Sequence, residues 1–344
     1  MKSDQILNNF VHTFIDRLKK DGIGEYASRP STLMLYHYTT AEGLKGIIQQ
    51  DKIWATNFRY VNDRTEFLYA NSILESELRS RLPTKRKLID AVFDAILQTD
   101  DLLVGAVDIF IACFCEKGDL LSQWRGYGGR GGGYAIGLGD IKLELPHAGF
   151  NYGIYQVNYD ESQQKTLIKF LIDEFCTAVE QLGKGIKPAS VEPPIIYSEL
   201  PARDPKKPPA PLIIKSKAPE PLGELCKRLS FAFLEVACCF KNPLFHIEEE
   251  WRLVHKRYSE SKAAPDSVEF RTSGATLIPY VALPLSTKAH PRLGGDNSRW
   301  NFSLEEIVCG PGLNNPVIEN SLQFLTAILP HKVAIKHSDI KVRV

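Results

Sequence analysis

The stretch VDIFIACFC, residues 107–115, decides the fold of this chain. It is apolar throughout except for Asp108, and it is rich in residues that favour β-strands. Strict alternation of apolar and polar residues is typical of a strand with one wet face, whereas a continuous apolar run indicates a strand buried on both faces. We therefore expect residues 107–115 to lie inside a sheet that is covered on both sides.

Further strands and helices are predicted on both sides of this stretch. The pattern predicts strands at residues 33–39, 51–58, 134–139, 154–159, 246–255, 276–284, 304–310 and 331–338. It predicts helices at residues 41–50, 63–78, 85–98, 161–182, 222–240 and 317–329. The helix predicted at residues 41–50 follows the capping pattern T-x-x-E, which runs from Thr39 to Glu42. Because helices and strands do not alternate strictly, we predict an α+β fold with a mixed or antiparallel central sheet flanked by helices.

The length of 344 residues suits one large domain or two modest ones. We expect residues 1–30 to form an amphipathic helix and a link, and residues 31–344 to form a single domain. Within that domain, residues 188–221 hold ten of the chain's 21 prolines, which argues against a regular helix or a central strand there. We interpret this segment as an irregular insertion.

The composition narrows the classes of partner. With 42 basic and 41 acidic residues the net charge is +1, so the chain as a whole does not attract nucleic acid or a membrane surface. No apolar run approaches the roughly 18 residues that span a bilayer, and the N-terminus lacks the apolar core of a signal peptide. The seven cysteines include no CxxC pair. We therefore expect a cytoplasmic protein without a bound metal, and the sequence leaves its oligomeric state open.

Unusual polar residues gather in four short segments, each beside a predicted strand or turn. These are LYHYTT (35–40), WATNFRYVNDRTEF (54–67), LSQWRGYGGRGGG (121–133) and HIEEEWRLVH (246–255). An active site assembled from several strand ends has this distribution. In the second segment Asn62 and Asp63 also form a good helix cap, which is the stronger explanation for them.

The glycine-rich segment is predicted to be a loop. Its glycines would let a ligand approach the backbone, and Arg125 and Arg130 can bind phosphate. A flexible hairpin loop explains the pattern equally well, and Trp124 fits either a stacking platform or a core position. Because no helix is predicted after the glycines, the segment is neither a Rossmann nor a Walker loop.

The acidic segment carries the clearest chemistry. On a strand Glu248, Glu250 and Arg252 would share one face. Two carboxylates so placed repel each other, which raises one pKa or creates a site for a positive group, and Arg252 can neutralise part of the charge. A solvated edge strand is the plainer alternative. His37 by itself is more typical of a structural histidine, because no other histidine lies at metal-ligand spacing.

In their order along the chain, the segments LYHYTT–GLKGII–IWATNFRYVNDRTEF, FCEKGDLLSQWRGYG, EEEWRLV and IVCGPG resemble the DUF2971 family of bacterial proteins. The resemblance extends over roughly residues 35–344. The name of this family records that its function is undefined, so the resemblance implies no activity.

The same segments resemble, more distantly, the ADP-ribosyltransferase fold, with its split central sheet. This resemblance implies that Glu250 is the catalytic carboxylate, that Glu248 assists it, and that His37 binds the hydroxyls of the nicotinamide ribose. It further implies contacts to NAD from Tyr38, Thr39, Ser122, Trp124, Arg125, Tyr127 and Arg130. The middle motif can be filled by Ser122 or Tyr127, and Tyr38 stands where several transferases have glycine.

The implied function is an NAD-consuming enzyme that cleaves the bond between nicotinamide and ribose and needs no metal. The acceptor of ADP-ribose can be a protein, a nucleic acid, a small molecule or water, and the implied biological role is that of a bacterial toxin or anti-phage effector. Two alternatives stay open at this point. One is a non-catalytic nucleotide-binding sensor that uses Arg125, Arg130 and the glycines, and the other is a metal-independent nuclease with His37 and Glu250 as acid and base.

Overall fold

The structure is a computed structural model. It describes residues 2–28, 33–61, 65–98, 107–129, 132–143, 152–191, 195–197, 213–215, 219–258, 268–285, 300–313, 315–329 and 331–341.

A mixed sheet of ten strands dominates the described part of the chain. Its strands are β1 (Leu35–Thr39), β2 (Lys52–Asn57), β3 (Val107–Cys115), β4 (Tyr134–Leu143), β5 (Tyr152–Gln156), β8 (Glu250–Tyr258), β9 (Glu269–Ser273), β10 (Thr276–Pro284), β11 (Trp300–Cys309) and β12 (Ala334–His337). Their order is β12-β11-β4-β1-β3-β2-β10-β9, while β8 pairs with both β3 and β5. All pairs are antiparallel except β11 with β12.

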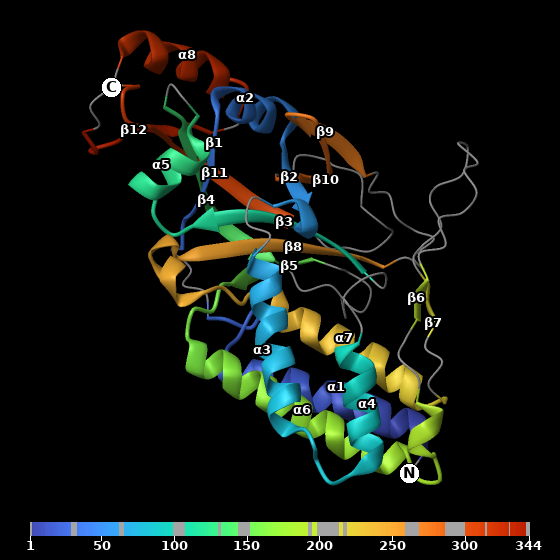
Figure 1. Cartoon of the computed structure of the whole chain (residues 1–344). Helices are drawn as coiled ribbons and strands as arrows, with labels where there is room; N and C mark the ends of the chain where they lie inside the picture. Colours follow the sequence, from blue (N-terminus) through green and yellow to red (C-terminus); the bar gives the residue numbers. More distant parts are fainter. Residues whose placement is uncertain are drawn as a thin grey trace, which may run out of the picture.

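Helices cover both faces of this sheet (Figure 1). The helices are α1 (Ser3–Asp21), α2 (Ala41–Gln50), α3 (Thr65–Arg81), α4 (Lys87–Leu97), α5 (Leu121–Tyr127), α6 (Glu161–Leu182), α7 (Leu222–Ala237) and α8 (Pro316–Thr326). In one apolar cluster α2 and α8 pack on the sheet, and in the other α1, α3, α4, α6 and α7 form a helical lobe on its opposite face. This arrangement confirms the predicted α+β class.

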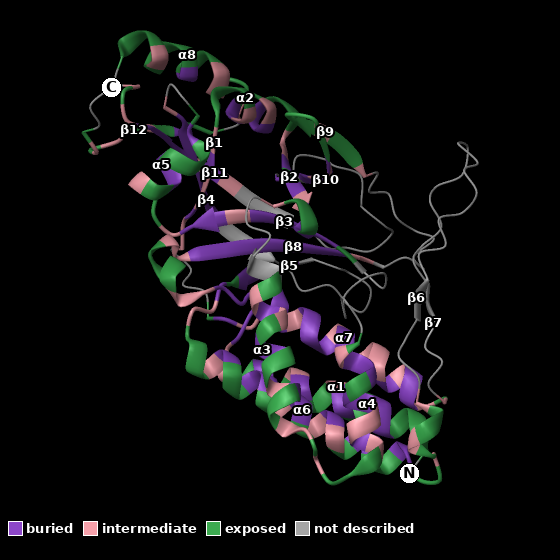
Figure 2. Ribbon diagram, viewed as in Figure 1, coloured by how far each residue is buried: buried purple, intermediate pink, exposed green. Residues whose placement is uncertain are grey.

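The strand β3 is buried on both faces, as its sequence predicts. Ile109 and Ile111 belong to the cluster that includes the helical lobe, whereas Phe110 and Phe114 belong to the cluster that includes α2 and α8. Figure 2 shows the neighbouring strand β8 buried as well. A strand between two apolar layers needs apolar side chains in both directions, which explains the unbroken run.

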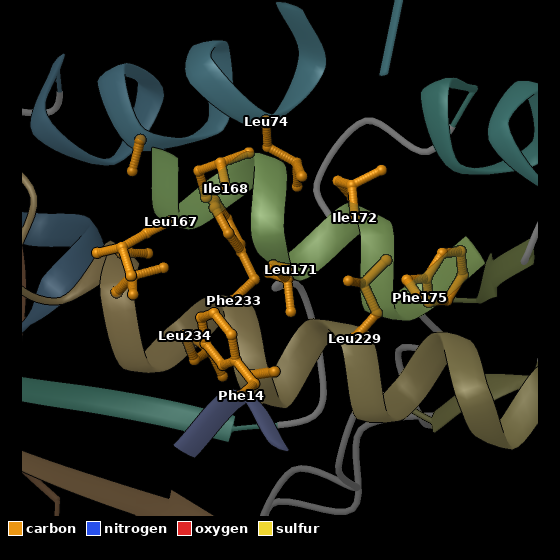
Figure 3. Packing of buried hydrophobic residues seen from close by; sticks show 14 of the residues in the cluster. Phe14, Leu74, Leu167, Ile168, Leu171, Ile172, Phe175, Leu229, Phe233 and Leu234 are labelled. Carbon is orange, nitrogen blue, oxygen red and sulfur yellow. The ribbon is translucent and has the colours of Figure 1, made fainter. Parts of the chain in front are cut away.

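The helical lobe has its own core around α6 (Figure 3). Phe175 of α6 is buried with Leu229 and Phe233 of α7, and Phe14 of α1 is fully buried in the same cluster. The helix α6 is capped by Asp160, whose carboxylate accepts hydrogen bonds from two backbone N–H groups of the first turn. The N-terminal helix α1 packs against α6 and α7, so it is an integral part of this lobe.

Three local predictions need correction or comment. The cap of α2 is Thr40, whose side chain accepts a hydrogen bond from the N–H of Gly43, because Thr39 is still the last residue of β1. Residues 121–127, predicted to lie in a loop, form the helix α5. In the insertion, β6 (Ile195–Tyr197) and β7 (Ile213–Lys215) form a separate two-stranded sheet.

No helix in the described ranges is long and apolar enough to cross a membrane.

Candidate functional site

The central sheet divides along one edge of β3. At Cys115 this edge pairs with Tyr36 of β1, and at Phe110 and Ile111 it pairs with β2. Between these pairings the edge has no strand partner within the described sheet. The side chain of His37 lies there, with Nδ1 at 2.9 Å from the carbonyl oxygen of Cys113.

This contact determines the hydrogen-bonding state of the His37 ring. A carbonyl oxygen only accepts hydrogen bonds, so Nδ1 carries the proton and donates it. Burial lowers the pKa of His37, although the hydrogen bond to the Cys113 carbonyl opposes this effect. The ring is therefore neutral near pH 7, and Nε2 is left as an acceptor.

A pocket of about 160 Å³ lies at the division in the sheet. His37 of β1, Tyr127 of α5 and Glu250 of β8 all line it. The structure thus brings together three residues from three of the four segments that the sequence singled out. The other lining residues are Tyr36, Tyr38, Val61, Ile111, Cys113, Cys115, Gln123, Lys241, Phe245 and Glu248.

Glu250 forms the charged wall of the pocket. Its Oε1 lies 2.8 Å from Nε of Arg252, and its Oε2 lies 3.1 Å from Nη2 of the same guanidinium and 2.7 Å from Nζ of Lys241. Arg252 is fully buried and also donates to the carbonyl oxygen of Cys238. Both cations are thus held against one buried carboxylate, because an isolated charge there would be very unfavourable.

The pKa of Glu250 follows from this arrangement. Burial by itself would raise it, but the charges and hydrogen bonds of Arg252 and Lys241 outweigh burial and lower it well below the ordinary range. Glu250 is therefore ionised at every physiological pH. It can stabilise a positive charge, whereas it is a weak base and holds no proton to donate.

Glu248 also lines the pocket, but it does not lie on the same strand as Glu250, contrary to the prediction from the sequence. The predicted strand 246–255 begins only at Glu250, since residues Pro243–Glu248 form the 3₁₀ helix η3 and Glu249 has a left-handed φ of 43°. Even so, Oε2 of Glu248 lies 2.7 Å from Nζ of Lys241. The two carboxylates therefore share one ammonium group, which relieves the repulsion expected from the sequence.

The position of α5 depends on contacts with β1. The rings of Tyr38 and Trp124 meet edge to face with their centres 4.7 Å apart, and Nε1 of Trp124 donates to Asp119. The Tyr38 hydroxyl donates to the carbonyl oxygen of Lys117 and accepts from the N–H of Leu120. Trp124 is buried by these contacts, so it occupies a core position and its ring does not line the pocket.

The remaining predicted contacts lie elsewhere. Ser122 and Arg125 are exposed on α5 and, like Thr39, are not among the lining residues. Arg130, Asn62 and Asp63 lie outside the described residues. Among the described side chains, no group of three or more His, Cys, Asp or Glu is arranged to hold a metal ion.

Lys241 and Gln123 are among the lining residues that sequence reasoning missed. Lys241 follows an apolar helix as a single basic residue, which carries no recognisable signal. Gln123 lies inside the LSQWRGYG segment, but its importance depends on burial, and a sequence read as a loop predicts exposure. Only the spatial arrangement reveals their role.

The fold and the site define an α+β protein with a charged pocket at a division of its central sheet. Residues 123–253 match the model of the family described as Protein of unknown function (DUF2971). The match confirms the expected DUF2971 resemblance over that segment. It includes Gln123, Tyr127, Lys241 and Glu250, while His37 lies before it. No curated protein and no solved structure gives a significant match to the chain.

Proposed function

We propose that this protein is an NAD-consuming enzyme of the ADP-ribosyltransferase type. The observation that carries the proposal is the meeting of His37, Tyr127 and Glu250 in one pocket, although they come from three distant segments. The division of the sheet at His37 adds support, because a split sheet is part of the expected resemblance. Fold alone does not define an activity, so the argument rests on the chemistry of these side chains.

In the proposed reaction the C–N bond between ribose and nicotinamide breaks, and nicotinamide leaves as a neutral molecule with the bonding electron pair. Positive charge then develops on the ribose, as in glycoside cleavage. A nucleophile of the acceptor forms the new bond to the ribose carbon, and its proton passes to Glu248. NAD and the acceptor thus give an ADP-ribosyl acceptor, nicotinamide and one proton.

Glu250 has the electrostatic properties that this reaction needs. It stays ionised, and a fixed negative charge beside the ribose stabilises the oxocarbenium-like transition state. Glu248 and Glu250 already hold one positive group between them, the ammonium of Lys241, at 2.7 Å from each. Stabilising a developing cation is the same electrostatic task.

His37 and Tyr127 have complementary roles in the proposal. Because Nδ1 of His37 is engaged with the Cys113 carbonyl, Nε2 can accept a hydrogen bond from a ribose hydroxyl. The Tyr127 ring, 44% exposed, provides an aromatic surface at the pocket on which a nicotinamide ring can stack. Both residues thus position the substrate, while Glu250 stabilises the positive charge that develops on the ribose.

The size of the pocket defines how NAD would bind. Sites that enclose a whole drug-sized ligand measure about 300–1,000 Å³. The pocket of about 160 Å³ is smaller, so it would hold one ring of the dinucleotide with its ribose at the entrance. The rest of NAD would lie along the outer surface.

Two observations argue against the alternatives. The proposed sensor uses Arg125, Arg130 and the glycines; Arg125 is exposed and does not line the pocket, and Arg130 lies outside the described residues. A nuclease would need a general acid, but the pKa values of His37 and Glu250 are both lowered, so near pH 7 Glu250 is ionised and His37 is a neutral imidazole whose single N–H is donated to the Cys113 carbonyl.

The test is release of nicotinamide from NAD by the purified full chain. NAD labelled in its adenylate part would be offered with protein, RNA, DNA or water as acceptor, and both nicotinamide and label transfer would be measured. We expect Glu250→Gln to lower the rate at least about 100-fold, which is the loss typical of one electrostatic group. We expect Tyr127→Ala to lower it by about tenfold, since one stacking contact is worth about 1 kcal/mol.

The matched control is Glu249→Gln, the same substitution at the neighbouring glutamate. Glu249 binds Lys117 at the surface, 2.7 Å away, and does not line the pocket. The Glu249→Gln variant should therefore release nicotinamide at the wild-type rate. If the wild type and Glu250→Gln release nicotinamide equally slowly with every acceptor, the proposal is wrong.

A further inference from the structure

Gln123 differs from the other buried glutamine of this protein. Gln164, fully buried on α6, accepts a hydrogen bond from Tyr69 and donates to the carbonyl oxygens of Asn158 and Lys241. The side chain of Gln123, 6% exposed on α5, makes no hydrogen bond within the described part of the chain, and it lines the pocket. Buried amides nearly always have partners, and the amide of Gln123 is not among the fully enclosed side-chain atoms that lack one, so it is open to the pocket, where a ligand can supply the partner.

The backbone beneath Gln123 is fixed before any ligand binds. The next residue, Trp124, is held by the Tyr38 ring and by a 2.7 Å hydrogen bond to Asp119. Asp119 in turn accepts from the hydroxyl of Ser338 and the N–H of Asp339. A side chain on so well anchored a helix presents its amide in a defined place, which favours selective binding.

We propose that Gln123 is the specificity-determining residue of the pocket. Its carboxamide pairs with a planar ring that carries an N–H donor next to an acceptor. This inference rests on the proposed function and names the part of NAD that enters: the primary carboxamide of nicotinamide presents this donor and acceptor pair. The adenine edge presents an equivalent pair, to which glutamine binds in other proteins, so the test must separate the two.

The charges nearby favour a neutral ligand group. Lys241 and Arg252 are already engaged by Glu248 and Glu250, so neither cation is available to receive the carboxylate of a ligand. An amide satisfies the donors and the acceptor of Gln123 together, whereas nicotinate offers acceptors only. We therefore expect the pocket to discriminate between nicotinamide and nicotinate.

The experiment measures binding of free nicotinamide, nicotinate, adenine and benzamidine to the full chain by ligand-observed NMR. We expect the wild type to bind nicotinamide at least about tenfold more tightly than nicotinate, the factor that about 1.4 kcal/mol gives. Gln123→Leu should weaken the binding of nicotinamide by a similar factor and remove the discrimination between nicotinamide and nicotinate. Gln123→Glu, which has the same shape, should turn the preference towards benzamidine, because a carboxylate pairs with an amidinium.

Gln49→Leu, at an exposed glutamine of α2, is the control and should bind as the wild type does. Should Gln123→Leu fail to fold, the nearly isosteric Gln123→Glu still reports the change of preference.

The inference is overturned if the wild type binds none of the rings, or if both Gln123 variants keep the wild-type preferences. Turnover of NAD that depends on Glu250 but not on Gln123 would overturn this inference and leave the proposed reaction standing. Adenine binding that depends on Gln123 would retain its role and remove nicotinamide from the pocket.

Discussion

Nδ1 of His37 lies 2.9 Å from the carbonyl oxygen of Cys113, which belongs to the part of β3 between its pairing with β2 and its pairing with β1. A side chain here makes a hydrogen bond where a neighbouring strand would otherwise make one. The division of the sheet and the state of the His37 ring are therefore linked.

Replacing His37 should change how stability depends on pH. The native pKa of His37 is lowered by burial, so the unfolded chain, with a pKa of about 6.5, takes up the proton first. The contribution of neutral His37 is complete above about pH 6.5 and declines as the pH falls below it. The free energy of unfolding of His37→Phe, measured in urea, should approach that of the wild type between pH 7 and 5.5. A difference that is constant over this range would contradict the prediction.

Removing Glu250 should destabilise the fold far more than removing its neighbour. Glu250→Gln leaves the fully buried Arg252 without its carboxylate, and breaking a buried ion pair in this way costs about 3–5 kcal/mol. Glu249→Gln breaks only the surface pair with Lys117, which contributes at most about 1 kcal/mol. Urea unfolding at pH 7 measures both values. Equal losses would show that the buried network does not hold the fold.

The same network should make the protein sensitive to acid in a defined window. The native pKa of Glu250 is lowered to about 2, while an unfolded glutamate titrates near about 4.3. Its contribution is therefore complete above about pH 4.3 and is lost as the pH falls towards 2. Below pH 4.3 the stability of the wild type should fall towards that of Glu250→Gln. Parallel curves for the two proteins would exclude this linkage.

Gly133 should not tolerate a side chain. An added Cβ would lie 2.7 Å from the carbonyl oxygen of Thr39 and would also strike the backbone of Gly128, so it would push apart β1, β4 and the end of α5. Gly133→Ala should lose at least about 1–3 kcal/mol of stability, as overpacking does. Gly46→Ala is the control: nothing lies within 4 Å of its Cβ, and alanine in a helix gains about 0.5–1 kcal/mol over glycine. Thermal unfolding should show a lower melting temperature for Gly133→Ala and a higher one for Gly46→Ala than for the wild type.

The buried thiols should resist alkylation. Burial raises the pKa of Cys238 to about 12, and burial with the nearby charge of Glu250 raises that of Cys115. The thiolate is the reactive form, and it is scarce at pH 7.5 for both. Mass spectrometry after iodoacetamide treatment should find these thiols unmodified in the native protein and modified in urea. Rapid native labelling of Cys115 would mean that the pocket thiol is activated.

Much of the fold follows from local sequence. The apolar run 107–115 became β3 with the predicted bounds, and the amphipathic segment 161–182 became α6. Both depend on the spacing of apolar side chains, which a chain displays before it folds. The first turn of α2 was misjudged by one residue, because Thr39 and Thr40 cap a helix equally well and only the pairing of β1 with β4 assigns Thr39 to the strand.

The candidate site was only partly predictable. His37, Tyr127 and Glu250 stood out by residue type and flanking pattern, and they line one pocket. Gln123 and Lys241 did not stand out, because a glutamine in a glycine-rich segment and a lysine after a helix are ordinary in sequence. Their importance comes from burial beside other polar groups, and burial is a property of neighbours distant in the chain.

The sequence by itself determined the α+β class, the two-faced burial of β3 and the segments from which the pocket is built, since these depend on periodicity and residue type. Tertiary structure alone decided that β3 is shared between β1 and β2, which places His37 against Cys113. It also decided that Lys241 joins Glu248 to Glu250. Pairing of distant strands and neutralisation of buried charge are long-range effects, and their free energy exists only once the chain has folded.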